Sequence, residues 1–185
     1  MRRVLAVPTV FSVGSTECSS ERTGFRPAGT LRVTRSDRAE YSAEYFLDPE
    51  GTTVLVTADH GPVHLFSLTD TDYYLTLVAK RVPWPATPPF HHLELVGPKT
   101  DAEALETHRN RIRDVVGLKL FASIDEIADQ ETHHSARACA WRNAHDDREL
   151  LDLDLRAMLG PRYDALGPAV AKRMVQPVPA AKIVI

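Results

Sequence analysis

The chain has 185 residues, 43% of them hydrophobic and 25% charged, which is the composition of a globular domain rather than of a fibrous or disordered protein. Its 22 basic residues are balanced by 25 acidic ones, so it lacks the positive excess that holds a nucleic acid. No run approaches the roughly 18 apolar residues of a membrane span, and we expect no membrane partner. Cys18 and Cys139 are too few for a disulfide framework, so we expect free thiols in a cytoplasmic protein.

The first half of the chain, residues 2–97, consists of short apolar runs separated by turn residues, with no helical period. This pattern predicts a sheet of about six strands. The run TLRVTRS alternates as a half-buried strand does, and DPEG and DHGP are strong turns. Because successive runs are joined by short connections, we expect an antiparallel meander, which could also close into a partial barrel.

The second half, residues 100–176, predicts three or four helices. Thr100 with Glu103 and Ser123 with Glu126 fit the capping box that begins a helix, and Gly117 is suited to end the first one. The run LLDLDLRAML alternates like a strand but lacks β-branched residues, which favours a helix. A last short helix over 168–175 and an edge strand in the tail complete the prediction.

Strands followed by helices is the order of an α+β domain, in which helices gather on one side of an antiparallel sheet. We therefore expect a single α+β domain over 1–185, with the sheet over 2–97 and the helices over 100–176 packed on one face.

The helix that begins at Ile124 carries the most informative polar residues. At about 100° per residue, Glu131 falls among the apolar residues that must face the sheet, and His134 lies at the flank of that face. A carboxylate that faces a core needs a partner, for which Arg142 or a group on the sheet is available. Alternatively, Glu131 and His134 line a pocket between helix and sheet, where burial raises the pKa of the carboxyl and both groups suit general acid–base catalysis.

The run FHHLELVG is the second candidate. On a strand, His92 and Glu94 share one face while His91 shares the other with leucines, so the two histidines cannot bind one metal ion together. We include His92 and Glu94 as catalytic candidates. The alternative is that they form cross-strand hydrogen bonds on a solvated face.

Four further residues are candidates for ligand binding. Trp84 lies in the proline-rich loop before FHHLELVG, which could cover a pocket mouth. Trp141 and Arg142 lie further along the helix of Glu131, and His64 lies on a strand after a turn. A metal triad of His64, His92 and Glu94 is geometrically conceivable, but nothing in the spacing demands it, and we expect no metal site.

The motifs of dinucleotide-binding folds, P-loop proteins, serine hydrolases and zinc proteases are missing from the sequence. We therefore favour a cofactor-independent enzyme that acts on a small molecule by acid–base catalysis, such as an isomerase, cyclase, lyase or hydrolase. An excess of arginine over lysine is typical of GC-rich bacterial genomes, which suggests a specialised bacterial biosynthetic pathway. The alternatives are a non-catalytic protein that binds a metabolite, haem, flavin or mononuclear metal, and an accessory subunit. The oligomeric state, a homodimer included, stays open.

Overall fold

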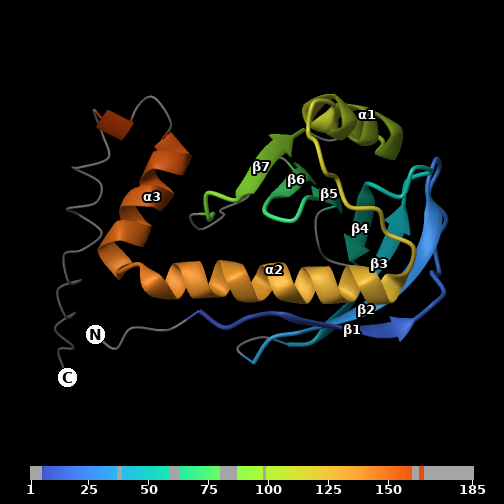
Figure 1. Ribbon diagram of the computed structural model, residues 1–185, viewed down its shortest axis with the longest axis horizontal. Helices are drawn as coiled ribbons and strands as arrows, with labels where there is room; N and C mark the ends of the chain where they lie inside the picture. The colour runs from blue at the N-terminus through green and yellow to red at the C-terminus, as the bar shows by residue number, and fades with distance from the viewer. Residues whose placement is uncertain are drawn as a thin grey trace, which may run out of the picture.

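The protein is described by a computed structural model, which covers residues 6–36, 39–58, 63–79, 87–97, 99–159 and 163–164. The order of elements confirms the predicted α+β class, with seven strands followed by three helices (Figure 1). The strands are β1 (Val10–Ser15), β2 (Arg26–Thr34), β3 (Tyr41–Leu47), β4 (Val54–Ala58), β5 (Val63–Leu68), β6 (Tyr73–Val78) and β7 (His91–Val96). The helices are α1 (Asp101–Ile112), α2 (Ile124–Ala144) and α3 (Asp147–Leu159).

The strands form one open sheet in chain order, from β1 at one edge to β7 at the other, and the sheet does not close into a barrel. All neighbouring strands are antiparallel except β6 and β7, which are parallel with Tyr73 opposite His91. The predicted meander is therefore wrong at its last step. A short connection can only reverse the chain, whereas the longer proline-rich connection before β7 returns it to the end where β6 began.

The helices cover both faces of the sheet, so the prediction that they pack on one face is wrong. Adjacent residues of β3 show the reason, since Tyr45 belongs to the apolar cluster under α2 and Phe46 to the cluster under α1. Strands β3, β4 and β5 contain runs of consecutive buried residues, and a strand that is apolar on both sides needs cover on both sides. We call these two sides the α2 face and the α1 face.

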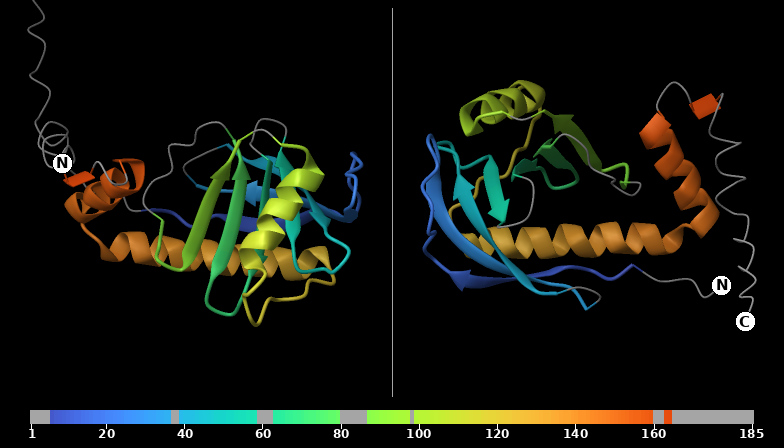
Figure 2. Two further views of the ribbon diagram at one scale, coloured as in Figure 1. Left: turned by 90° about the horizontal axis from the view of Figure 1, so that it is seen from above. Right: turned by 180° about the vertical axis from the view of Figure 1, so that it is seen from behind.

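Helix α2 lies in the concave side of the curved sheet, with β1 and β2 along one flank and the opposite edge of the sheet above it (Figures 1 and 2). Side chains of α2 form hydrogen bonds with the main chain at β1, which is an edge strand of the sheet. The Thr132 hydroxyl accepts a hydrogen bond from Phe11 N at 3.1 Å, and the Ser135 hydroxyl accepts one from Thr9 N at 2.7 Å. These bonds fix how the helix is rotated, and hence which of its side chains face the sheet.

The helix ends follow the predicted signals in part. Thr100 and Glu103 form the expected capping box, and Ser123 caps α2. The helix predicted as far as Gly117 instead ends at Ile112, and the Val116 side chain is 91% exposed rather than packed on the sheet. The ambiguous run LLDLDLRAML is helical, within α3. The helix predicted over 168–175 and the tail strand lie outside the described residues.

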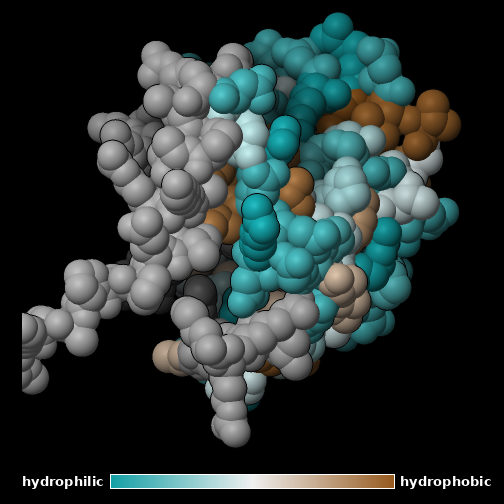
Figure 3. All heavy atoms as spheres, turned by 90° about the vertical axis from the view of Figure 1, so that its left-hand side faces the viewer, coloured by the Kyte–Doolittle hydropathy of each residue, from teal (hydrophilic) through white to brown (hydrophobic). Residues whose placement is uncertain are grey.

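Length and hydropathy decide whether a helix in the described part of the chain could span a membrane. No helix there is both long enough and apolar enough to cross a bilayer. On the side that Figure 3 shows, the coloured part of the surface is mainly hydrophilic, with smaller hydrophobic areas between the polar side chains.

Candidate functional site

The two polar residues of α2 singled out from the sequence, Glu131 and His134, are both buried, with exposed fractions of 8% and 2%. Glu131 Oε1 accepts a hydrogen bond of 2.9 Å from the hydroxyl of Tyr73, the first residue of β6. The group on the sheet, rather than Arg142, is thus the partner that the buried carboxyl finds. This meets the requirement that a buried polar group be hydrogen-bonded.

Two imidazoles complete the cluster around Tyr73. The ring of His91, which begins β7 beside Tyr73, lies with its centroid 5.0 Å from the Tyr73 ring, and the His134 ring lies at 5.3 Å. The two histidine rings are 6.2 Å apart. We call Tyr73, His91, Glu131 and His134 the Glu131 cluster. It joins α2 to the two strands at the β7 edge of the sheet.

Burial dominates the electrostatics of this cluster. It raises the pKa of Glu131 from its ordinary value to about 7, although the Tyr73 hydroxyl acts in the opposite direction by bonding to the charged form. It lowers the pKa of His91 and of His134 to about 4, and the nearby Arg137 charge adds to that effect. Near neutral pH both imidazoles are therefore uncharged, while the carboxyl is poised between its acid and base forms.

Each imidazole has one buried nitrogen without a hydrogen-bond partner in the described chain. These atoms are Nε2 of His91 and Nδ1 of His134. A buried polar atom left without a partner costs about 1–3 kcal/mol, so such atoms are rare in folded proteins unless something else binds them. The His91 side chain is only half-buried, so the cluster approaches the molecular surface on that side.

The structure does not bring His92 and Glu94 into this cluster. Both lie on the α1 face, where His92 Nε2 is 2.9 Å from a carboxylate oxygen of Asp72, and a Glu94 carboxylate oxygen is 3.6 Å from Nε of Arg111. His92 thus contacts the turn before β6, and Glu94 contacts helix α1, rather than each forming the cross-strand hydrogen bond considered from the sequence. The reason is strand alternation, which places His92 and Glu94 on the face of the sheet opposite to that of His91.

His91 and Tyr73 are the members of the cluster that the sequence did not single out. The leucines that share the face of His91 gave no signal for it, because Leu95 is 49% exposed and the buried residue of β7 is Val96, on the other face. Tyr73 begins a strand that is apolar on both sides, so nothing local distinguishes it. Its pairing with His91 depends on the parallel register of β6 and β7.

The four predicted ligand-binding residues are scattered. Trp84 lies outside the described residues. Trp141 is half-buried with its ring 4.4 Å from the ring of His145. Burial raises the pKa of Asp154 on α3, and the Arg142 charge acts in the opposite direction. His64 is half-buried on the α2 face, opposite Leu77.

The α1 face holds a second buried histidine in a different setting. His108 of α1 is fully buried, and its two ring nitrogens lie 3.0 Å from the Ser67 hydroxyl and 2.8 Å from the Thr76 hydroxyl. The Ser67 hydroxyl in turn lies 3.2 Å from that of Thr53. Burial lowers the pKa of His108 to about 4. Because both ring nitrogens are hydrogen-bonded within the protein, we interpret His108 as a structural residue.

A shallow hollow of about 390 Å³ also lies on the α1 face, beside the loop that follows β1. Glu44 lines it and accepts hydrogen bonds from main-chain and hydroxyl groups of Ser19 and Ser20. Cys18 lines it too, and burial raises the pKa of its thiol. A thiol that stays protonated at neutral pH is a poor nucleophile, so this hollow offers weaker chemistry than the Glu131 cluster.

Within the described ranges, no three His, Cys, Asp or Glu side chains are placed to hold a metal ion. Comparison with known protein families, with curated proteins and with solved structures gives no match to this chain.

Proposed function

We propose that the protein is an enzyme that acts on a small organic molecule by proton transfer, with Glu131 as the general acid or base. The observation that carries the proposal is the carboxyl of Glu131, buried at 8% exposure and hydrogen-bonded to Tyr73, whose ring contacts two imidazoles that each have an unpartnered nitrogen. General acid–base catalysis is most efficient when the pKa of the catalytic group lies near the working pH, and burial brings the pKa of Glu131 to about 7.

The other members of the Glu131 cluster have supporting roles in this proposal. The Tyr73 hydroxyl donates to Oε1 of Glu131, which orients the carboxyl and leaves the other oxygen to exchange a proton with the bound molecule. The neutral imidazoles of His91 and His134 would supply a hydrogen bond each to polar groups of that molecule. An isomerisation, cyclisation, elimination or hydrolysis needs no more than such groups.

The test measures proton exchange directly. A panel of small keto acids, hydroxy ketones and lactones is incubated in deuterated water, and deuterium incorporation next to the carbonyl is followed by proton NMR. We expect at least one compound to exchange, and Glu131→Gln to slow that exchange about 100-fold, which is the low end of the contribution of a general base. In parallel, the carboxyl of Glu131 is titrated by carbon-13 NMR.

Neighbouring residues of β7 provide a matched control. His91→Gln should impair the reaction because His91 belongs to the Glu131 cluster, whereas His92→Gln should not because His92 faces the other side of the sheet and binds Asp72. A Glu131 carboxyl that titrates at the ordinary value for glutamate would refute the proposal. So would full activity of Glu131→Gln.

A second candidate is a protein that binds a metabolite or a chromophore such as haem or flavin without transforming it. The unpartnered nitrogens of His91 and His134 favour it equally, since a tightly held ligand would satisfy them without any reaction. A visible absorption spectrum and elemental analysis of the purified protein separate the two. A bound chromophore together with no exchange of any panel compound would support the binding protein. Under either candidate we expect a cytoplasmic protein, and sedimentation would show whether it is a homodimer.

A further inference from the structure

Arg137 of α2 is a cation held beside the Glu131 cluster by neutral groups. Its guanidinium lies over the Phe90 ring at 4.3 Å from the ring centroid, and Nη1 donates a 3.1 Å hydrogen bond to the carbonyl oxygen of Thr71. Phe90 in turn contacts His91, with the two ring centroids 5.0 Å apart. Arg137 follows His134 by one turn of helix, so it lies at the edge of the cluster where the cluster approaches the surface.

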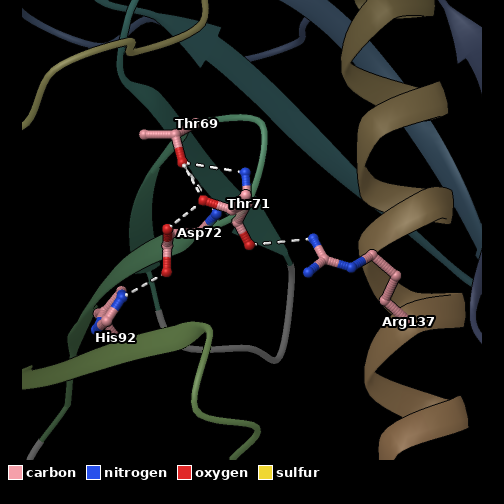
Figure 4. A network of polar contacts seen from close by, with 5 residues as sticks. All are labelled: Thr69, Thr71, Asp72, His92 and Arg137. Atoms are coloured by element: carbon pink, nitrogen blue, oxygen red, sulfur yellow. Dashed lines mark hydrogen bonds and ion pairs between the residues drawn. The ribbon is translucent and has the colours of Figure 1, made fainter.

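The turn that binds Arg137 is braced by hydrogen bonds between its own residues. The Thr69 hydroxyl accepts hydrogen bonds from the main-chain N–H groups of Thr71 and Asp72, at 3.2 and 2.9 Å. Figure 4 shows the result, with the Thr71 carbonyl turned toward Arg137 and its hydroxyl turned the other way, toward Asp72.

The positive charge of Arg137 has no carboxylate partner among the residues that the structure describes. Asp72, an acidic group on which the Arg137 charge acts, is bound instead by the Thr71 hydroxyl and by Nε2 of His92 at 2.9 Å, on the other side of the turn (Figure 4). A guanidinium presents five N–H donors, and the hydrogen bond of Arg137 to Thr71 is exposed at the surface. One of those donors binds Thr71, and the rest are available to a ligand.

The charges around the cluster favour an anion over a cation there. The Arg137 charge adds to burial in lowering the pKa of both His91 and His134, so it lies close enough to act on each imidazole. A further cation, Lys119, also acts on His134 but is engaged by Asp70 at 3.3 Å and by Gln130 at 2.9 Å. Of these two cations, Arg137 is the one without a carboxylate partner among the residues that the structure describes.

From this arrangement we propose that the small molecule bound at the Glu131 cluster carries an oxyanion, a carboxylate or a phosphate, and that the Arg137 guanidinium binds it. This inference rests on the proposed function in taking the Glu131 cluster as the ligand site. A guanidinium binds carboxylates and phosphates through two parallel hydrogen bonds, which would orient the molecule with its reactive carbon toward Glu131. The neutral imidazoles of His91 and His134 would hydrogen-bond the same or an adjacent group.

The experiment uses inorganic phosphate and succinate as probes on the full-length protein labelled with nitrogen-15 in its histidines. Each probe is titrated at constant ionic strength against chloride, and the imidazole signals of His91 and His134 are followed by NMR. We expect saturable shifts with at least one probe, and the probe that saturates shows whether the site prefers phosphate or carboxylate. The His108 signal, from the other face of the sheet, should stay in place and reports that the fold is intact.

Arg137→Gln should weaken the binding at least about tenfold, since it removes a charge-assisted hydrogen bond. Arg113→Gln is the matched control, because Arg113 is an exposed arginine at the end of α1. Equal affinity in wild type and Arg137→Gln, or no saturable shift with either probe, would overturn the inference. Glu131→Gln keeps Arg137, so anion binding that survives in this variant while its proton exchange is normal would refute the acid–base role alone.

Discussion

The two faces of the sheet each bury histidines whose pKa is lowered to about 4, yet they treat them differently. On the α1 face, both nitrogens of His108 are engaged by hydroxyls of Ser67 and Thr76. On the α2 face, His91 and His134 each keep a buried nitrogen without a partner. Burial and a shifted pKa alone therefore do not mark a functional residue. What distinguishes the two faces is whether the protein itself completes the hydrogen bonds.

Replacement of His108 by phenylalanine should show the largest effect. The phenyl ring fills a similar volume but leaves the buried hydroxyls of Ser67 and Thr76 without their imidazole partner. Each unsatisfied buried group costs about 1–3 kcal/mol, so we expect the free energy of unfolding at pH 7 to fall by roughly 2–4 kcal/mol. Urea denaturation followed by circular dichroism measures it.

His134→Phe is the matched control, because it makes the same substitution at a buried histidine on the other face of the sheet. His134 is as well buried, but phenylalanine there removes an unpartnered nitrogen rather than a partner of other groups. We expect the unfolding free energy to change by less than about 1.5 kcal/mol, as for other swaps that conserve volume. Similar losses for both replacements would show that the two faces do not differ in this way.

Lowering the pH should reduce the difference in unfolding free energy between wild type and His108→Phe. The folded pKa of His108 is about 4, below the ordinary 6.5, so the folded state binds a proton less readily than the unfolded state. The stability that depends on neutral His108 is thus fully present above pH 6.5 and is lost as the pH falls toward 4. Up to roughly 3 kcal/mol of the difference between the two proteins should disappear over this range. Urea denaturation at pH 7, 5.5 and 4 tests it, and a constant difference would contradict the structural role of His108.

Glu131→Gln should show a smaller effect of opposite sign. Burial raises the folded pKa of Glu131 to about 7, so the unfolded chain ionises first as the pH rises, and wild type loses stability between about pH 4.5 and 7. A glutamine carries no charge and can still accept from Tyr73. We expect Glu131→Gln to be up to roughly 3 kcal/mol more stable than wild type at pH 8, with little difference at pH 4.5. Thermal unfolding at both values measures it, and a less stable variant at pH 8 would mean that Glu131 stabilises the fold as an ion.

The combination of higher stability and lost proton exchange in Glu131→Gln would be the signature of a site kept at a cost in stability. His134→Phe and Arg137→Gln extend the same comparison on the α2 face. On the α1 face, His108 is hydrogen-bonded to Ser67 and Thr76, so replacing His108 removes bonds that the fold uses.

Part of this could be predicted from residues near one another in the chain. The capping residues Thr100 and Ser123 fix where two helices begin, and the helical period places Glu131 toward the sheet. Strand alternation separates His91 from His92. It does not say which of the two faces α2, and the structure places His91, rather than the predicted candidate His92, beside His134.

Local patterns determined the elements of this protein, their order and the inward side of α2, because helix and strand periods and capping bonds involve residues only a few positions apart. Tertiary structure decided that the helices cover both faces, that β7 runs parallel to β6, and that Tyr73 contacts His91 and hydrogen-bonds Glu131. These outcomes depend on how strands far apart in sequence pair and on which side each helix docks. The pairing energies responsible lie in contacts between distant residues, which no stretch of the chain contains by itself.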